Sequence, residues 1–163
     1  MTFGFQFDWG RLLGTSSIQV LVVEDYEPFR RFLISTLQNG LEVRDIHEVS
    51  DGLEAVQEAQ TLQPDLILLD IGLPTMNGIE AARRIREVSP TSKILFVSEN
   101  RSAGVAEEAL STGGGGYVVK SDAAGELLPA VDAVLKGKRF LSANLTGHDS
   151  SVDDQTEAAE RGY

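Results

Sequence analysis

Short apolar runs of strand length alternate along this chain with longer stretches in which apolar residues recur every three or four positions. The short runs are rich in β-branched residues, which favour extended strands. They lie at 18–23, 43–49, 65–70, 93–98 and 117–120. The pattern therefore predicts five strands, each followed by a helix.

The stretches between the runs have the apolar periodicity of amphipathic helices. The first begins near Pro28, which suits an opening helical turn, and the second follows the turn at 51–52 and ends before Pro64. The third covers about 78–88, and the last follows residue 120. Strands alternating with such helices are typical of β-α units, so we expect an α/β protein with a parallel sheet.

The helix predicted at about 102–111 has a thinner apolar face than the others. Its apolar positions are small residues and one leucine: Val105, Ala106, Ala109 and Leu110. We expect this helix to shift most easily. The four glycines that follow can supply a left-handed helix cap and a loop. Together with Lys120 they resemble a phosphate-binding loop in outline, but Val119 stands where that loop needs glycine.

Two end segments fall outside the repeating pattern. Residues 1–17 carry aromatic side chains at a period of two, which predicts either a tail or an additional strand packed on this domain or on a neighbour. Residues 142–163 are rich in Asp, Glu, Ser and Ala, which predicts an acidic tail or linker. The expected organisation is one domain at 18–141 between these two segments.

Composition narrows the possible functions. A chain of 163 residues, 42% of them hydrophobic, suits one domain. A net charge of −11 disfavours direct nucleic-acid binding and suits a divalent cation or a basic partner surface. The chain has no cysteine, and His47 and His148 lie far apart, so thiolate and histidine metal sites are not expected. No membrane-spanning or export signal is seen, which predicts a cytoplasmic protein.

Polar side chains lie where the predicted strands end: Glu24, Asp25, Asp70, Ser98 and Lys120. Ligands of open parallel sheets bind at the carboxyl ends of the strands, so we expect these groups to converge. Clustered carboxylates repel one another unless a cation lies among them, and Mg²⁺ suits such a site. Lys120 and Ser98 can both donate to a phosphate oxygen.

Over about residues 18–141 the chain resembles the response-regulator receiver domains of bacterial two-component signalling. Four separated motifs carry the resemblance: "VLVVEDYEPFRRFL", "PDLILLDIGLPTMNGIEAARRIR", "KILFVSEN" and "GGGGYVVKS". This resemblance implies a flavodoxin-like (βα)5 doubly wound parallel sheet with strand order 2-1-3-4-5.

The resemblance also implies a role for each matching residue. Asp70 is similar to the phosphoryl-accepting aspartate, and Asp25 to a ligand of Mg²⁺ or Mn²⁺. Glu24 is similar to the second acidic residue, which often reaches the metal through water. A backbone carbonyl two residues after the acceptor, here Gly72, is the remaining metal contact from protein in this family.

Three further positions match the parts of the family that sense phosphorylation. Lys120 is similar to the phosphate-binding lysine, while Ser98 and Tyr117 are similar to the conformational switch pair. Pro74 and Gly78 resemble the loop after the acceptor, where proline fixes φ and glycine supports the turn into the next helix.

Three positions depart from the commoner family pattern. Glu24 replaces an aspartate, and Glu99 stands where a small residue is usual. A carboxylate at 99 can crowd or repel a phosphodonor, so we predict that Glu99→Ala alters autophosphorylation or dephosphorylation with a small-molecule donor. Ser121 replaces a proline, a substitution common in the NarL/LuxR-type subclass, which carries a helix-turn-helix. Too few residues follow Leu145 for that DNA-binding domain, so a stand-alone or truncated receiver is expected.

The implied function is a signalling switch that catalyses only its own phosphorylation and dephosphorylation. A sensor histidine kinase or phosphotransfer protein donates the phosphoryl group to Asp70, and the face near the last two helices changes. A homodimer through those helices or through the N-terminal extension is a further expectation.

Two alternatives belong to other functional classes. An aspartyl-nucleophile phosphatase or phosphotransferase places a second aspartate where this chain has Gly72. An unphosphorylated binding module on the same fold is expected to have lost an acidic residue or the lysine, and none is lost here.

Overall fold

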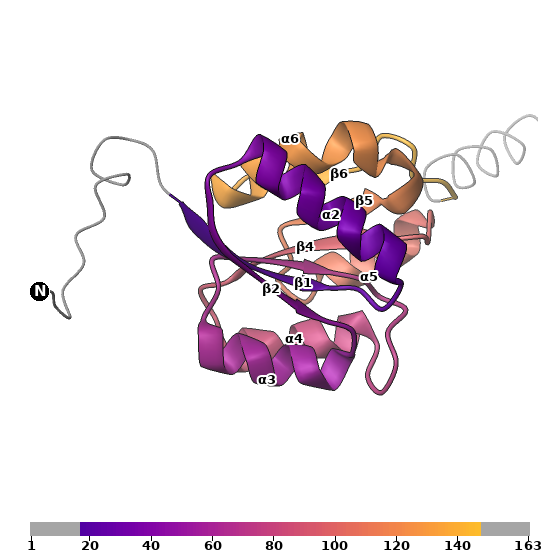
Figure 1. Cartoon of the computed structure of the whole chain (residues 1–163). Helices are drawn as coiled ribbons and strands as arrows, with labels where there is room; N and C mark the ends of the chain where they lie inside the picture. The colour runs from indigo at the N-terminus through magenta and orange to yellow at the C-terminus, as the bar shows by residue number, and fades with distance from the viewer. Residues whose placement is uncertain (1–16, 148–163) are drawn as a thin grey trace, which may run out of the picture.

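The computed structural model describes residues 17–147 (Figure 1). The predictions for the aromatic-rich segment 1–16 and for most of the acidic segment lie outside these residues. The described chain forms a parallel sheet in the order β2-β1-β3-β4-β5-β6. Its strands are β1 (Ile18–Val23), β2 (Val43–Val49), β3 (Leu66–Leu69), β4 (Lys93–Ser98), β5 (Gly116–Val119) and β6 (Phe140–Leu141).

The predicted doubly wound sheet and the order 2-1-3-4-5 are confirmed, with one strand more than predicted. Strand β6 pairs in parallel with β5, Gly116 opposite Phe140 and Tyr117 opposite Leu141. Two residues are too few to show any periodicity, so no apolar pattern predicted this strand. The last predicted strand also shifts by one residue, because Lys120 begins the short 3₁₀ helix η1 (Lys120–Asp122) instead of ending β5.

In the described part of the chain, α-helices cover both faces of the sheet (Figure 1). They are α2 (Glu27–Gly40), α3 (Gly52–Leu62), α4 (Gly78–Val88), α5 (Ala103–Leu110) and α6 (Ala123–Leu135). Helices α2 and α6 pack on one face, and α3, α4 and α5 pack on the other. The described residues therefore form three layers, helix, sheet and helix.

The central strands β1 and β3 are buried on both faces, which fixes the position of the site residues at their carboxyl ends. All four residues of β3 are fully buried, and so are Val20, Leu21 and Val22 of β1. Val20 and Val22 face α2 and α6, whereas Leu21 faces the opposite helices. Continuous apolar runs of this kind are expected of parallel strands that are covered on both sides.

Helix α4 begins directly against the end of β3. Asn77 caps the helix, and its side chain accepts hydrogen bonds from the backbone N–H groups of Ile79 and Glu80. A side chain at Gly78 would overlap the backbone carbonyl of Asp70, so only glycine permits this close approach. The glycine predicted to support the turn thus brings the start of α4 against the strand end that carries Asp70.

Candidate functional site

A hollow of about 530 Å³ lies at the carboxyl ends of β1, β3, β4 and β5. All five strand-end residues predicted from the sequence line it, together with Gly72. Asp70 is placed by a backbone hydrogen bond from its N–H to the carbonyl of Val23, so the ends of β3 and β1 are in register. The predicted convergence of these groups is therefore observed.

Three carboxylates line this hollow. Glu24 is fully buried, Asp70 is 6% exposed, and Asp25 is exposed. One oxygen from each can be chosen so that all three lie within 4.8 Å of one another. Carboxylates this close repel strongly unless positive charge lies among them.

Lys120 supplies positive charge to this group of carboxylates. Its Nζ atom lies 2.7 Å from Oε1 of Glu24 and 3.1 Å from Oδ2 of Asp70. The ammonium also lies over the ring of Phe29, 4.9 Å from its centroid, where the face of the ring attracts a cation. One lysine faces three carboxylates, so the site keeps an excess of negative charge.

The pKa values of Glu24 and Lys120 are both raised, but for different reasons. Burial raises the pKa of the Glu24 carboxyl, and this effect outweighs the lowering by Lys120 and by the backbone N–H of Tyr26. Burial lowers the pKa of Lys120, but its close contact with the Glu24 carboxylate and the charge of Asp70 outweigh that effect and raise it. Lys120 therefore stays protonated at neutral pH.

The oxygens at this site suit a hard divalent cation. Oε1 of Glu24 is buried and has no aligned hydrogen-bond donor, although it contacts Lys120 as an ion pair. Asp25 and the backbone of Gly72 border the same hollow from its exposed side. Mg²⁺ prefers one or two carboxylates and retains several waters, which an open hollow permits.

The two residues predicted to form a conformational switch lie on adjoining strands: Ser98 ends β4, and Tyr117 is the second residue of β5. Ser98 is 4% exposed, and its hydroxyl accepts a hydrogen bond from the backbone N–H of Asn100 at 3.1 Å. Tyr117 is fully buried, and its hydroxyl donates to the backbone carbonyl of Asn100 at 2.7 Å. Burial raises the pKa of the Tyr117 hydroxyl, so it stays a donor at neutral pH.

Two residues near the site were missed by sequence reasoning. Phe29 was assigned only to an apolar helix face, yet its ring contacts Lys120. Asn100 binds both members of the switch pair through its backbone, which no side-chain pattern can reveal. Its position two residues after the strand-ending serine was the only available signal.

The fold is a parallel α/β sheet with an acidic, lysine-containing site at its carboxyl edge, and this site is compatible with a divalent metal ion. Residues 20–132 match the family model described as the response regulator receiver domain. The chain therefore belongs to this family of phosphorylation-dependent signalling switches. Among the described helices, none has both the length and the apolar character needed to cross a bilayer.

Relatives of the NarL/LuxR type support the same assignment. The chain is 34% identical over 126 residues to the transcriptional activator protein ExaE of Pseudomonas putida, covering 77% of this chain and 59% of ExaE. It is 31% identical over 127 residues to the nitrate/nitrite response regulator NarL of Escherichia coli, covering 78% and 59%. The chain thus spans about three fifths of the length of these relatives.

Solved structures show the same architecture. A LuxR-family response regulator from Aurantimonas sp. aligns with a TM-score of 0.75 at 28% identity, covering 91% of this chain and all of that one. The receiver domain of NarL from Mycobacterium tuberculosis aligns with a TM-score of 0.70 at 27% identity, covering 75% and 98%.

Proposed function

We propose that Asp70 is the phosphoryl acceptor of this receiver domain. The observation that carries the proposal is the contact between Nζ of Lys120 and Oδ2 of Asp70, inside a group of three carboxylates. Lys120 begins η1, between β5 and α6, and its ammonium group can bind a phosphoryl oxygen. Asp70 is 6% exposed and faces an open hollow, so a donor can reach it.

The reaction requires one bond to form and one to break. A carboxylate oxygen of Asp70 attacks the phosphorus of a phosphohistidine on a partner kinase or phosphotransfer protein, and the phosphorus–nitrogen bond breaks as the imidazole leaves. Asp25, Asp70 and the carbonyl of Gly72 would hold Mg²⁺ or Mn²⁺, with Glu24 reaching it through water. The bound cation would neutralise charge that develops on the phosphoryl oxygens.

Ser98 and Tyr117 convert the new phosphoryl group into a change of shape. The hydroxyl of Ser98 turns from the N–H of Asn100 toward the phosphoryl oxygen and draws the loop after β4 with it. Tyr117 responds because its hydroxyl is bonded to the same loop. The output is a shifted population of two conformations of the surface around α5, β5 and α6.

Several properties of the whole protein belong to the proposal. We place it in the cytoplasm, with a sensor histidine kinase or phosphotransfer protein as donor and a second copy as a possible partner through α5 and α6. The acidic chain makes no direct contact with nucleic acid, and its catalysis is confined to its own phosphorylation and dephosphorylation. The domain boundaries at 18 and 141 are part of the same proposal.

The acceptor assignment is tested by Asp70→Asn, with the exposed Asp132→Asn as a matched control. Each protein is incubated with Mg²⁺ and acetyl phosphate, and acid-labile phosphate is measured by intact mass. We expect wild type and Asp132→Asn to gain one phosphoryl group and Asp70→Asn to gain none. A label that persists in Asp70→Asn would overturn the assignment.

Glu99 tests how the rim of the hollow controls donor access. This exposed residue lines the hollow beside Ser98, so its carboxylate meets an anionic donor as it enters. Glu99→Ala is expected to change the rate of phosphorylation by acetyl phosphate or the rate of dephosphorylation. Glu99→Gln removes the charge but keeps the size of the side chain, so it separates these two effects. Unchanged rates in both directions would remove this role.

An aspartyl-nucleophile phosphatase has less support. That chemistry needs a general acid or base close to the nucleophile, and position 72 offers only a glycine backbone. We therefore expect no sustained turnover of phosphate esters. An unphosphorylated module is opposed by the presence of all three carboxylates and the lysine at one site.

A further inference from the structure

A segment that follows β6 crosses the carboxyl ends of β5 and β4. We refer to residues 142–147 as the C-terminal strap. The strap makes its shorter hydrogen bonds to the rest of the domain in two separate places, next to different parts of the site. Between them lie two longer bonds of Asn144, whose side chain donates to Asp122 at 3.4 Å and whose carbonyl accepts from Arg101 at 3.5 Å. One attachment involves β5 and α6, and the other involves the loop that follows Ser98.

The first attachment is the proximal anchor, centred on Ser142, which is 5% exposed. The Ser142 hydroxyl accepts from the backbone N–H of Val119 at 2.7 Å and donates to the carboxylate of Glu126. The same carboxylate accepts the backbone N–H of Ala143 at 3.1 Å. The buried Ser142 hydroxyl thus has a partner both as acceptor and as donor, and these bonds fix the start of the strap to β5 and α6.

The second attachment is the distal anchor, centred on Thr146. Its backbone N–H donates to the carbonyl of Arg101 at 2.7 Å, and its carbonyl accepts the N–H of Ala103 at 2.9 Å. Its hydroxyl makes a longer bond, 3.2 Å, to the same Arg101 carbonyl. Arg101 lies three residues after Ser98, and Ala103 is the first residue of α5. The distal anchor is therefore hydrogen-bonded to the loop between Ser98 and α5.

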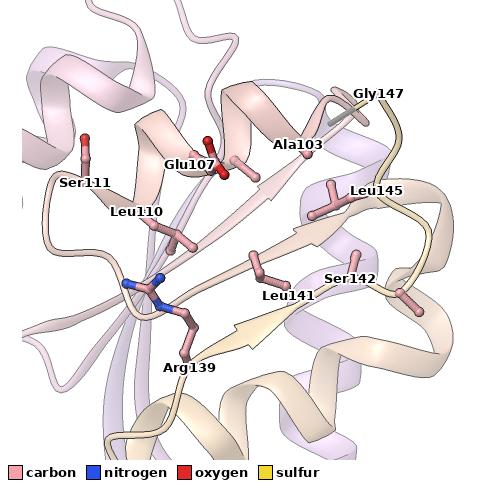
Figure 2. A pocket seen from close by; sticks show the side chains of 11 residues that line it. Ala103, Glu107, Leu110, Ser111, Arg139, Leu141, Ser142, Leu145 and Gly147 are labelled. Atoms are coloured by element: carbon pink, nitrogen blue, oxygen red, sulfur yellow. The ribbon is translucent and has the colours of Figure 1, made fainter. Parts of the chain in front are cut away.

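The strap also forms one wall of a groove of about 730 Å³ (Figure 2). Ala103, Glu107 and Leu110 of α5 line one side, and Leu141 and Leu145 lie across from them. A change in the distance between α5 and the strap therefore changes the width of this groove.

We propose that the distal anchor holds the unphosphorylated conformation and that phosphorylation of Asp70 releases it. This inference rests on the proposed function, since it uses Asp70 as acceptor and Ser98 as switch. In the sheet, β3 and β6 lie on opposite sides of β4. When Ser98 turns toward a phosphoryl group on Asp70, the loop at 99–102 moves toward β3 and therefore away from the strap.

The two anchors respond differently in this proposal. The loop's movement lengthens the bonds from Thr146 to Arg101 and Ala103, whereas Ser142 remains bonded to β5 and α6. Phosphorylation thus frees the far end of the strap and widens the groove beside α5. Any part of the chain after residue 147 receives the signal through this backbone connection.

Thermodynamic reciprocity supplies a second consequence. If phosphorylation weakens the distal anchor, weakening the anchor must favour the phosphorylated conformation by the same factor. Thr146→Pro removes the N–H that donates to Arg101. Thr146→Val is the matched control, because it keeps both backbone hydrogen bonds and loses only the longer hydroxyl contact.

The first experiment measures amide hydrogen exchange of the 163-residue chain with Mg²⁺, with and without beryllofluoride as an acyl-phosphate mimic. The amides of Thr146 and Ala103 are expected to exchange faster with the mimic. The amide of Ser142, bonded to the carbonyl of Tyr117, serves as internal reference and is expected to be unchanged. Unchanged or slower exchange at Thr146 in protein that binds the mimic would overturn the proposal.

The second experiment measures beryllofluoride affinity for the two variants by calorimetry. Since an exposed hydrogen bond contributes about 1 kcal/mol, Thr146→Pro is expected to bind about fivefold more tightly than wild type, and Thr146→Val about equally. Equal affinity of all three proteins would overturn the proposal. Failure of wild type to bind beryllofluoride or take up phosphate would instead contradict the proposed function, so the two failures are distinct.

Discussion

Helices α4 and α5 pack side by side on the same face of the sheet, yet they are held with different strength. Helix α4 buries Gly78, Ile79, Ala81, Ala82 and Ile85, whereas α5 buries only Ala106, Ala109 and Leu110. Since buried apolar area stabilises packing, α4 is anchored more firmly. The difference indicates that a movement of the loop before α5 displaces α5 and leaves α4 in place.

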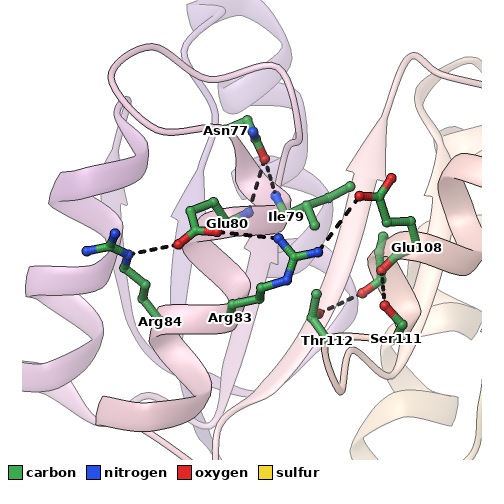
Figure 3. Close-up of polar contacts among 9 residues, drawn as sticks. Asn77, Ile79, Glu80, Arg83, Arg84, Glu108, Ser111 and Thr112 are labelled. Carbon is green, nitrogen blue, oxygen red and sulfur yellow. Dashed lines mark hydrogen bonds and ion pairs between the residues drawn. The ribbon is translucent and has the colours of Figure 1, made fainter.

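The hydrogen bonds at the helix ends also hold α4 more firmly than α5. The cap of α4 receives two hydrogen bonds through Asn77, while Ser102 receives one from α5 at 3.3 Å. Arg86, near the end of α4, donates to the carbonyls of Ser92 and Pro90 and ties that end to the next loop. At the end of α5, the hydroxyls of Ser111 and Thr112 donate back to carbonyls of that helix (Figure 3).

The largest expected effect contrasts one buried side chain from each helix. Ile85→Ala should lower the free energy of unfolding by about 4 kcal/mol, because a fully buried isoleucine leaves a cavity between α4 and the sheet. Leu110→Ala should lower it by about 2 kcal/mol, because α5 can relax into the space. Urea unfolding of both variants measures the difference. Equal losses would contradict the unequal anchoring.

A smaller effect is expected at the ion pair that joins the helices. Arg83 pairs with Glu80 on its own helix at 3.3 Å and with Glu108 of α5 at 3.8 Å (Figure 3). These side chains are about half exposed, so removing the contact between helices should cost no more than about 0.5 kcal/mol. Arg83→Ala should nevertheless speed amide exchange in α5.

Arg84→Ala is the matched control for this measurement. Arg84 pairs with the same Glu80 but makes no ion pair with α5 in the described part of the chain. Its loss should leave exchange in α5 unchanged. Equal acceleration by the two substitutions would show that the pair between helices does not restrain α5.

The sequence predicted these features to different extents, for physical reasons. The strands and α4 follow from local apolar periodicity, and the site at the strand ends follows because parallel strands bring their carboxyl ends to one edge. The thin apolar face of 102–111 also predicted that α5 would be the weakly held helix. These are properties that neighbouring residues along the chain determine.

Features that depend on contacts distant in sequence were missed. Strand β6 has two residues and owes its pairing to β5, and the assignment of residues 142–163 to an acidic tail missed a serine buried between β5 and Glu126. The glycine run was expected to form a cap and loop, but its tight fit comes from Phe96 beside Gly114 and Val134 beside Gly115. Backbone bonds to Asn100 and Arg101 likewise leave no signal in a single sequence.

Amide hydrogen exchange of α4 and α5 in the same protein, compared before and after phosphorylation by acetyl phosphate with Mg²⁺, tests the central claim most directly. Phosphorylation at Asp70 should change exchange in α5 and in the loop at 99–102, and should leave the core of α4 around Ile85 unchanged. The Asp70→Asn protein should show no change in either helix. Equal changes in α4 and α5, or a change that survives in Asp70→Asn, would contradict a switch that runs from Asp70 through Ser98 to α5.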